Sequence, residues 1–306
     1  MGRWFTVVVA LVGAAVTITT AAGAATRTEA NRGGPGHGGG LRYFAIGCGF
    51  SHSNMDDAIV FPGQVGRSHD HTYFGNRTTN AASTPESLRA AGRTSCRLRA
   101  DTAAYWVPTL YQNRREVRPS KAQLYYVLRG YDQLHPFPPG LRVVAGDARA
   151  TRPQSTRVTF WACGGHAARA VPSSEVPNAC GVVDVKGFGR LPGMKKPGVI
   201  HWRAKTYLEL HVDFPDCWDG VHLDVPDHAS HMAYSRDYVC PRSHPVKVPL
   251  IRLTIRYPID RGAGVTLASG GVHSGHADFF NAWDQRALAK LVDDCFHDRP
   301  CNEPRR

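Results

Sequence analysis

Acidic side chains are scarce in this sequence. The chain has 25 Asp and Glu residues against 37 Lys and Arg residues, which gives a formal net charge of +12. Such a balance favours anionic surroundings, for example an acidic polysaccharide or cell-wall polymer. The basic residues are scattered and form no basic tract, so nucleic acid is not an expected partner. A basic surface that serves only solubility is the alternative interpretation.

Three further absences narrow the class of protein. None of the eight cysteines forms a CxxC pair, which argues against a zinc ribbon or a redox motif. The chain has no GxSxG stretch or other convincing nucleophile motif. After the N-terminal segment, no stretch approaches the roughly 20 apolar residues that a membrane-spanning helix needs. We therefore expect no membrane span once a signal segment has been removed.

The N-terminal segment has the pattern of an export signal. An early Arg3 is followed by an apolar run and then by small residues around Ala24, as in a secretory signal peptide over residues 1–25, although an uncleaved anchor is the alternative. Residues 26–40 are rich in Gly and polar groups and indicate a flexible leader. We expect residues 41–306 to form a single secreted, β-rich domain.

The cysteines fit an exported protein. Their number, eight, is even, and all follow the leader, so four disulfides are expected. We expect Cys295 to pair with Cys301, because CFHDRPC closes a short loop, and Cys48 to pair with Cys96. The pairing of the other four stays open.

The hydrophobic pattern indicates a mainly β fold. Apolar and polar residues alternate over 206–214 and over 250–259, as in half-buried strands. On the first of these, His211 is expected to face solvent. Further strands are expected from residues 104, 123, 141 and 157. One helix is expected after Asp284, its predicted N-cap. The predicted architecture is an antiparallel β-sandwich with long loops and a C-terminal helix, stapled by disulfides.

Histidines occur in three short clusters. SHDHTYFGN places two histidines where an extended chain would point both to one face, as does GHADFF for a histidine and an aspartate. PDHASHMAY spaces two histidines three apart, where one helical turn would bring them together. Imidazole is the commonest protein ligand for several transition metals, and carboxylates complete such sites. The candidate ligands for a divalent ion (zinc, copper, iron or manganese) are His69, His71, His228, His231 and His276.

A metal-free site is the alternative use of the same regions. A pair such as His276 with Asp278, or His228 with Asp227, could act as acid and base, with Tyr73 or Tyr234 as the acid. The candidate catalytic residues are therefore Asp278, Asp227 and Tyr73. Chemistry of this kind fits the cleavage of an acidic polysaccharide.

Four stretches, in order, carry a resemblance to a known family: DDAIVFPGQVGRSHDHTYFGN, FPDCWDGVHLDVPDHASHMAY, CPRSHPVKVPLIRLTIRY and GHADFFNAWD. Together they resemble a family of secreted bacterial and fungal proteins that is catalogued only as a domain of unknown function. The resemblance covers most of residues 43–296. It departs from the usual pattern at Val225, where Ser is common, and at Ala282, where Gly is common. Some fungal members are joined to WSC or other carbohydrate-binding modules, which implies polysaccharide surroundings.

The resemblance also bears on the site. The family's motif histidines correspond here to His69, His71, His228, His231 and His276, with Asp227 and Asp278 beside them. We expect a secreted protein whose His/Asp metal site acts on an extracellular or cell-wall polysaccharide, by hydrolysis with zinc or by oxidation with copper or iron. The alternatives are a non-catalytic glycan-binding module and a metal-independent His/Tyr enzyme.

Overall fold

The computed structural model describes residues 42–128, 133–165, 170–189, 196, 198–298 and 301. The expected signal peptide (1–25) and leader (26–40) lie outside the described residues, and a single domain from residue 41 stays a prediction. Every strand pairing described is antiparallel. The mainly β prediction is therefore confirmed.

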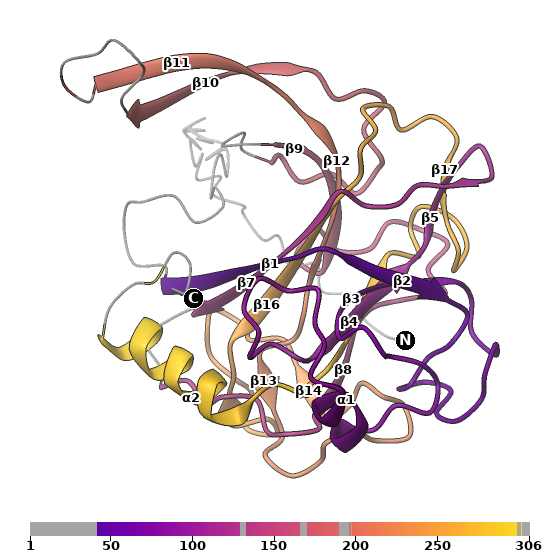
Figure 1. Ribbon diagram of the computed structural model, residues 1–306, viewed down its shortest axis with the longest axis vertical. Coiled ribbons are helices and arrows are strands. Elements are labelled where there is room, and N and C mark those ends of the chain that lie inside the picture. The colour runs from indigo at the N-terminus through magenta and orange to yellow at the C-terminus, as the bar shows by residue number, and fades with distance from the viewer. Residues whose placement is uncertain are drawn as a thin grey trace, which may run out of the picture. The chain divides into compact units, whose positions relative to one another are not determined.

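Five strands form the first sheet, in the order β1–β7–β16–β12–β9 (Figure 1). They are β1 (Arg42–Cys48), β7 (Lys121–Leu128), β16 (Leu250–Arg256), β12 (Tyr207–Asp213) and β9 (Thr159–Gly164). Alternation along each strand divides the sheet into two faces. On β12, Leu208, Leu210 and Val212 belong to the hydrophobic core, so the intervening polar residues lie on the outer face.

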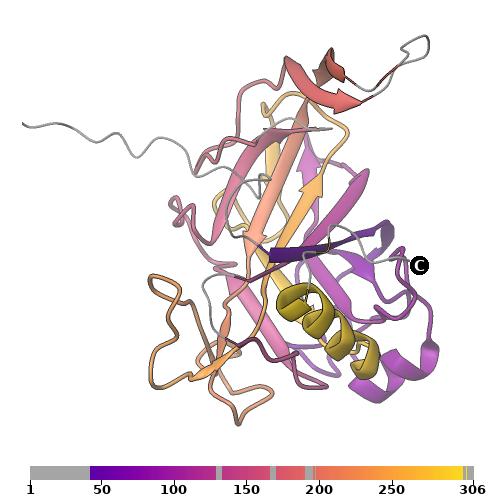
Figure 2. The same cartoon turned by 90° about the vertical axis from the view of Figure 1, so that its left-hand side faces the viewer.

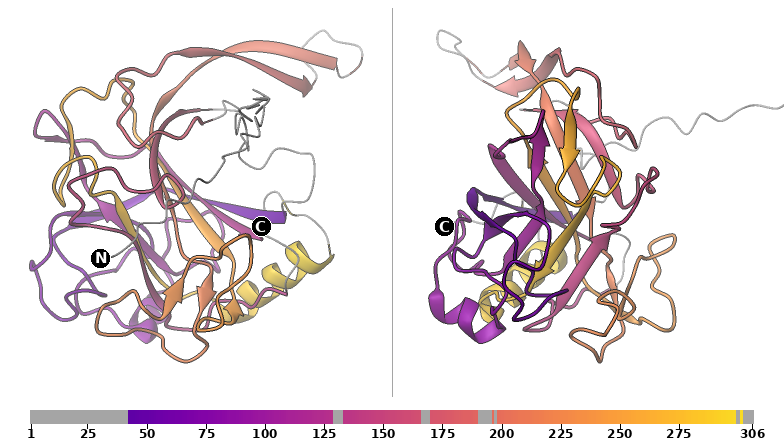
Figure 3. Two further views of the ribbon diagram at one scale, coloured as in Figure 1. Left: turned by 180° about the vertical axis from the view of Figure 1, so that it is seen from behind. Right: turned by 90° about the vertical axis from the view of Figure 1, so that its right-hand side faces the viewer.

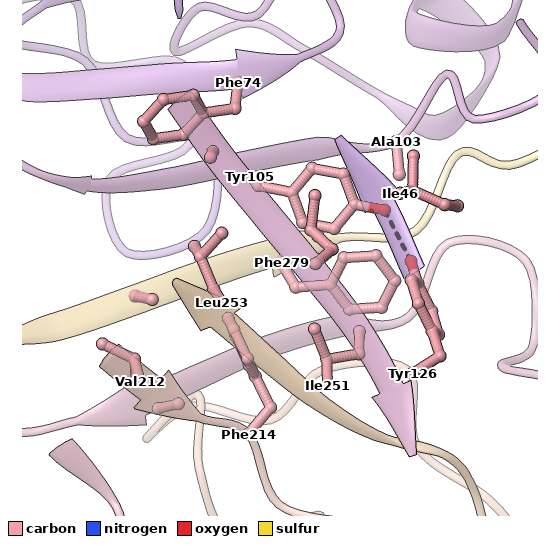
Figure 4. Packing of buried hydrophobic residues seen from close by; sticks show 14 of the residues in the cluster. Ile46, Phe74, Ala103, Tyr105, Tyr126, Val212, Phe214, Ile251, Leu253 and Phe279 are labelled. Atoms are coloured by element: carbon pink, nitrogen blue, oxygen red, sulfur yellow. Dashed lines mark hydrogen bonds between the residues drawn. The ribbon is translucent and has the colours of Figure 1, made fainter. Parts of the chain in front are cut away.

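Five strands also form the second sheet, in the order β2–β3–β4–β18–β8. They are β2 (Phe50–Asn54), β3 (His71–Gly75), β4 (Ala104–Pro108), β18 (His276–Phe280) and β8 (Arg142–Gly146). Figure 4 shows the core between the two sheets, where Phe279 of the second lies near Leu253 and Ile251 of the first. A buried hydrogen bond of 2.6 Å joins the hydroxyls of Tyr105 and Tyr126 in this core. The predicted sandwich is confirmed.

Smaller sheets border the sandwich. The strand β10 (Val182–Gly189) pairs with β11 (Gly198–Lys205) in a hairpin that extends beyond the other strands (Figure 3). Two three-stranded sheets have the orders β14–β13–β15 and β17–β5–β6. Their strands are β14 (Met232–Ala233), β13 (Cys217–Trp218), β15 (Val246–Lys247), β17 (Val265–Leu267), β5 (Leu110–Gln112) and β6 (Arg115–Glu116).

Two α-helices are described. The helix α2 (Gln285–Asp293), yellow in Figure 2, is followed by a π-helical turn (Asp294–Asp298). Its buried residues Leu288 and Val292 belong to the hydrophobic core. The side chain of Asp284 caps it by accepting hydrogen bonds from two backbone N–H groups, as predicted. The helix α1 (Pro85–Ala91) was not predicted, although Thr84 and Ser87 form a capping box at its start.

Four disulfides are present, and the two predicted ones are among them. Cys48 pairs with Cys96, and Cys295 with Cys301. The other two join Cys163 to Cys180 and Cys217 to Cys240. Such bonds persist in oxidising compartments, so they are consistent with an extracellular protein. Among the described residues, no helix is long and apolar enough to cross a membrane.

One interpretation of the alternating pattern was wrong. His211 of β12 was expected to face solvent, but it is buried with only 5% of its surface exposed. Its Nε2 atom lies 3.1 Å from Glu209 and its Nδ1 atom 3.0 Å from the hydroxyl of Thr254. An alternating row of polar residues can therefore be buried, with its members hydrogen-bonded to one another, rather than exposed to solvent.

Candidate metal centre

The outer face of the second sheet holds the candidate site. Since Phe74 and Phe279 point into the core, their neighbours on β3 and β18 point to the opposite face. His71 lies opposite Pro108 of β4, and Asp278 lies opposite Trp106 of the same strand. Because β3 and β18 both pair with β4, residues far apart in the chain meet on one surface.

Three histidines converge there. Each of His69, His71 and His276 offers a ring nitrogen that lies within 4.8 Å of those of the other two. The ring of His69 lies 4.2 Å from that of His71 and 5.0 Å from that of His276, measured between centroids. His69 precedes β3 and is half-buried, whereas the other two are buried. Three imidazoles at this spacing could hold a metal ion.

The backbone selects the nitrogen that is free to bind. The Nδ1 atom of His71 lies 3.0 Å from the carbonyl oxygen of Asp56, and that of His276 lies 2.8 Å from the carbonyl of Ser274. A carbonyl only accepts, so each Nδ1 carries the hydrogen and each Nε2 keeps a lone pair. The Nε2 atoms of His69 and His71 are buried without a hydrogen-bond partner. Metal-binding histidines are oriented by backbone carbonyls in the same way.

Two carboxylates adjoin the histidines. Ligand atoms of Asp57, His71 and Asp278 lie within 4.8 Å of one another, and all three residues are buried. The Oδ1 atom of Asp57 accepts 2.8 Å hydrogen bonds from the N–H groups of Ile59 and Val60. The Oδ2 atom of Asp278 is buried and has no partner. A buried carboxylate oxygen without a partner is costly unless a proton or a cation joins it.

Burial shifts the pKa values of this group toward the uncharged forms. It lowers the pKa of His276 to about 4 and, with the two neighbouring imidazoles, holds that of His71 well below its usual value. Burial also lowers the pKa of His69. It raises the pKa of Asp278 well above the usual range, with a further contribution from Asp57. The imidazoles are thus neutral at pH 7, which is the form that binds metals.

His228 and His231 lie outside the three-histidine group. His228 does not sit on a helical turn: its φ is +54°, and its Nδ1 atom lies 2.8 Å from the carboxylate of Asp224. Burial raises the pKa of Asp57, and an electrostatic effect of His228 opposes part of that rise. His231 is buried, with its Nε2 atom 2.7 Å from the carbonyl oxygen of Arg142.

Three other residues from the histidine motifs make structural contacts. Asp227 is exposed and accepts hydrogen bonds from the N–H groups of Ala229 and Ser230. The hydroxyl of Tyr73 is buried and donates to the carbonyl of Asp56 over 2.5 Å. Asp70 accepts a hydrogen bond from the hydroxyl of Tyr111. Catalytic roles for Asp227 and Tyr73 stay predictions.

Two residues near the candidate site were not singled out from the sequence. Asp57 lies in the DDAIVFPGQ stretch, ahead of the histidine pair, and nothing in its spacing ties it to Asp278. Asp224, rather than the adjacent Asp227, is the partner of His228. The spacing of four residues did not predict this pair, because it indicates a contact only on a helix and this segment is not helical.

The comparisons with known proteins bear on the family alone. No curated protein and no solved structure matches the chain. Residues 57–283 match the family described as Domain of unknown function (DUF1996). This span includes all three converging histidines and both carboxylates. The chain therefore belongs to the DUF1996 family.

Proposed function

We propose that this protein is a secreted, metal-dependent enzyme that acts on an extracellular or cell-wall polysaccharide. The observation that carries the proposal is the convergence of His69, His71 and His276, two of which keep a buried Nε2 atom without a hydrogen-bond partner. Buried polar atoms are nearly always paired, so such a group calls for a ligand. Neutral imidazoles that meet at this spacing fit a divalent ion best.

Zinc is the ion that the donor set favours. Three histidine nitrogens would hold the ion and leave a coordination position for water, as in catalytic rather than structural zinc sites. Zinc supplies a water molecule of lowered pKa, and hydrolysis follows as the reaction class. Copper or iron in the same set would favour oxidation instead.

The neighbouring residues have separate roles in this proposal. The Oδ2 atom of Asp278 is buried and unpaired; with a cation bound beside it, the ionised carboxylate would serve as a further ligand or as a base for a water molecule. Asp57 is held by two backbone N–H groups, and its negative charge would favour a cation bound at the centre. His228, held by Asp224, would contact the substrate.

Support for a polysaccharide substrate comes from the whole chain. The signal-like N-terminus and the four disulfides fit an exported protein. The net charge of +12 favours an acidic polymer. Acidic polysaccharides of cell walls meet both conditions.

The test is an activity assay with defined metal loading. The secreted protein is stripped with a chelator, reloaded with zinc, copper or iron, and incubated with acidic and neutral polysaccharides. The products are followed by mass spectrometry. Cleavage that needs one metal and is lost in His71→Ala supports the proposal. The variant His231→Ala changes a buried histidine outside the cluster and serves as the control. Equal cleavage by the metal-free and the metal-loaded protein would contradict the proposed metal-dependent activity.

A structural metal in a glycan-binding protein is the second candidate. His71, His276 and Asp278 are all at least 97% buried, as in a closed site that only holds loops together. X-ray absorption spectroscopy of the loaded protein separates the two candidates. A coordination shell that gains an added azide supports the enzyme, because only an open position admits it. A shell of protein ligands that azide leaves unchanged supports the structural role.

A further inference from the structure

The chain between β2 and β3 forms a loop that leads into the metal centre. We call residues 55–68 the metal-site loop, since His69 follows it directly. The N–H group of Ser68 donates to the carbonyl of Met55 over 3.0 Å, so the two ends of the loop are joined where the histidines begin. Among the described residues, the ring of His69 makes no hydrogen bond. Its position therefore depends on how the loop before it is closed.

The carboxylate of Asp56 ties this loop to the rest of the structure. Only 7% of Asp56 is exposed. Its Oδ1 atom accepts a 2.8 Å hydrogen bond from the N–H group of Gly66, across the loop, and its Oδ2 atom accepts from the N–H group of Ala81 over 3.2 Å. The N–H group of Gly63 donates to the carbonyl of the same Ala81 over 2.7 Å. Hydrogen bonds from backbone N–H groups to a carboxylate are stronger than those between neutral groups, so this side chain sets the shape of the loop.

The carbonyl of Asp56 orients two side chains of β3. It accepts hydrogen bonds from the Nδ1 atom of His71 over 3.0 Å and from the hydroxyl of Tyr73 over 2.5 Å. A carbonyl oxygen has two lone pairs, so it can accept both. The ring of Tyr73 is held in turn, because the imidazole of His52 stacks on it with 4.6 Å between centroids. The carbonyl is therefore fixed in direction, and the ring of His71 is fixed with it.

The next residue, Asp57, belongs to the group of candidate ligands. Ligand atoms of Asp57, His71 and Asp278 lie within 4.8 Å of one another. A peptide bond is planar, so the carbonyl of Asp56 and the Cα atom of Asp57 lie in one rigid plane. A shift of Asp56 would therefore move the group that orients His71 and the residue that supplies a carboxylate together.

We propose that Asp56 is a positioning residue of the metal centre. Its carboxylate holds the metal-site loop in the shape that binds a metal ion, and its carbonyl holds His71 with the Nε2 atom free. Partners that orient metal ligands typically change metal affinity by about 10–100-fold. Coupling of this kind is reciprocal, so a bound metal ion should also hold the loop more firmly. The inference rests on the metal centre of the proposed function and does not depend on the substrate or the reaction.

Zinc titration followed by calorimetry tests the proposal on the full secreted protein. Asp56→Ala should weaken zinc binding by about tenfold or more, and Asp56→Asn, which keeps one acceptor atom, should weaken it less. Asp216→Ala is the matched control. Asp216 is 1% exposed, and its carboxylate also accepts two hydrogen bonds, both from Ser235, outside the metal centre. Both alanine variants should unfold at a lower urea concentration than the wild type, but the control should bind zinc as the wild type does.

Two spectroscopic measurements separate positioning from general stability. In the metal-free wild type, heteronuclear NMR of the imidazole nitrogens should show the hydrogen of His71 on Nδ1 alone, whereas Asp56→Ala should show both tautomers. In the wild type, zinc should slow hydrogen exchange at the N–H groups of Gly66 and Ala81, which donate to Asp56. This second measurement needs no variant, so it decides the matter together with Asp56→Asn if Asp56→Ala does not fold.

The outcomes distinguish this proposal from the proposed enzyme. Full zinc affinity in a folded Asp56→Ala, an equal loss of affinity in Asp216→Ala, or hydrogen exchange that zinc leaves unaltered would overturn the positioning role. Zinc binding that depends on Asp56, in a protein that cleaves no polysaccharide, would support this role and contradict the proposed activity. Metal-dependent cleavage together with full zinc affinity in Asp56→Ala would support the enzyme and overturn the role of Asp56.

Discussion

The imidazole rings of His71 and His276 lie 5.9 Å apart, measured between centroids, although the whole of β4 separates their strands in the sheet. Both Nδ1 atoms face backbone carbonyls. The two rings are thus fixed by hydrogen bonds before a metal arrives, and His69 completes the group from the segment that precedes β3.

Zinc should stabilise the native protein through this cluster. At a free zinc concentration of about 100 times the dissociation constant, the free energy of unfolding should rise by about 2.7 kcal/mol. His71→Ala should abolish the rise. His231→Ala, which removes a buried hydrogen bond to Arg142, should lower stability by about 1–3 kcal/mol and keep the response to zinc. Urea unfolding with and without zinc measures all three. A full zinc response in His71→Ala would exclude this residue as a ligand.

Asp278→Asn should separate metal binding from stability. Burial and the nearby Asp57 raise the pKa of Asp278 well above its usual value, so at pH 8, above the pKa of this group in the unfolded chain, the carboxyl group lowers the stability of the metal-free protein. The neutral amide should therefore stabilise that form by about 1–3 kcal/mol. The same change should weaken zinc binding, because the charge of a carboxylate attracts the cation and a neutral amide has no such charge. Urea unfolding and zinc titrations at pH 8 measure the change in stability and the change in zinc affinity. Tighter zinc binding by the variant would contradict a role for Asp278 in the metal site.

The pH dependence of metal-free stability should report His276. Its pKa is about 4 in the folded protein and about 6.5 in the unfolded chain. As pH falls from 6.5 to 4, the unfolded chain takes up the proton first, so the native state loses stability, by about 3 kcal/mol from this residue. His276→Gln lacks this term. As pH falls from 6.5 to 4, the variant should therefore become more stable relative to the wild type. Urea unfolding in the presence of a chelator, at several pH values, measures the difference. A constant difference between the two proteins would refute the low pKa.

The Cys48–Cys96 disulfide should support the fold without taking part in metal binding. It spans 48 residues, and a loop of that length corresponds to about 4 kcal/mol of stabilisation on the chain-entropy model. The double variant Cys48→Ser, Cys96→Ser should lose about this much and still respond to zinc. Unfolding with and without zinc provides the measurement. Loss of the zinc response in a variant that remains folded would show that the site depends on this disulfide.

Local sequence patterns predicted much of the fold. Alternation over 206–214 and 250–259 predicted β12 and β16, and Asp284 marked the start of α2. The short loop of CFHDRPC favoured the Cys295–Cys301 bond. The sequence did not predict how Cys163, Cys180, Cys217 and Cys240 pair, because their pairing depends on the paths of loops, which no local pattern encodes.

The site was less accessible to sequence reasoning. Residue types and two-residue spacing singled out His69, His71 and His276, but only the order of the second sheet brings β3 and β18 together across β4. His231 has the same residue type, yet it satisfies a backbone carbonyl. The ring of the buried His211 is hydrogen-bonded to Glu209 and Thr254, and the alternating pattern does not distinguish such a paired row from a row that faces solvent.

Metal content tests the central claim most directly. The protein is purified from the culture medium without added metal, and its zinc, copper, iron and manganese are measured by elemental mass spectrometry. A double variant, His69→Ala with His71→Ala, is measured beside it, and circular dichroism confirms that the variant is folded. The account predicts about one transition-metal ion per wild-type chain and none in the variant. No bound metal in the wild type even after reloading, or equal metal in a folded variant, would contradict it.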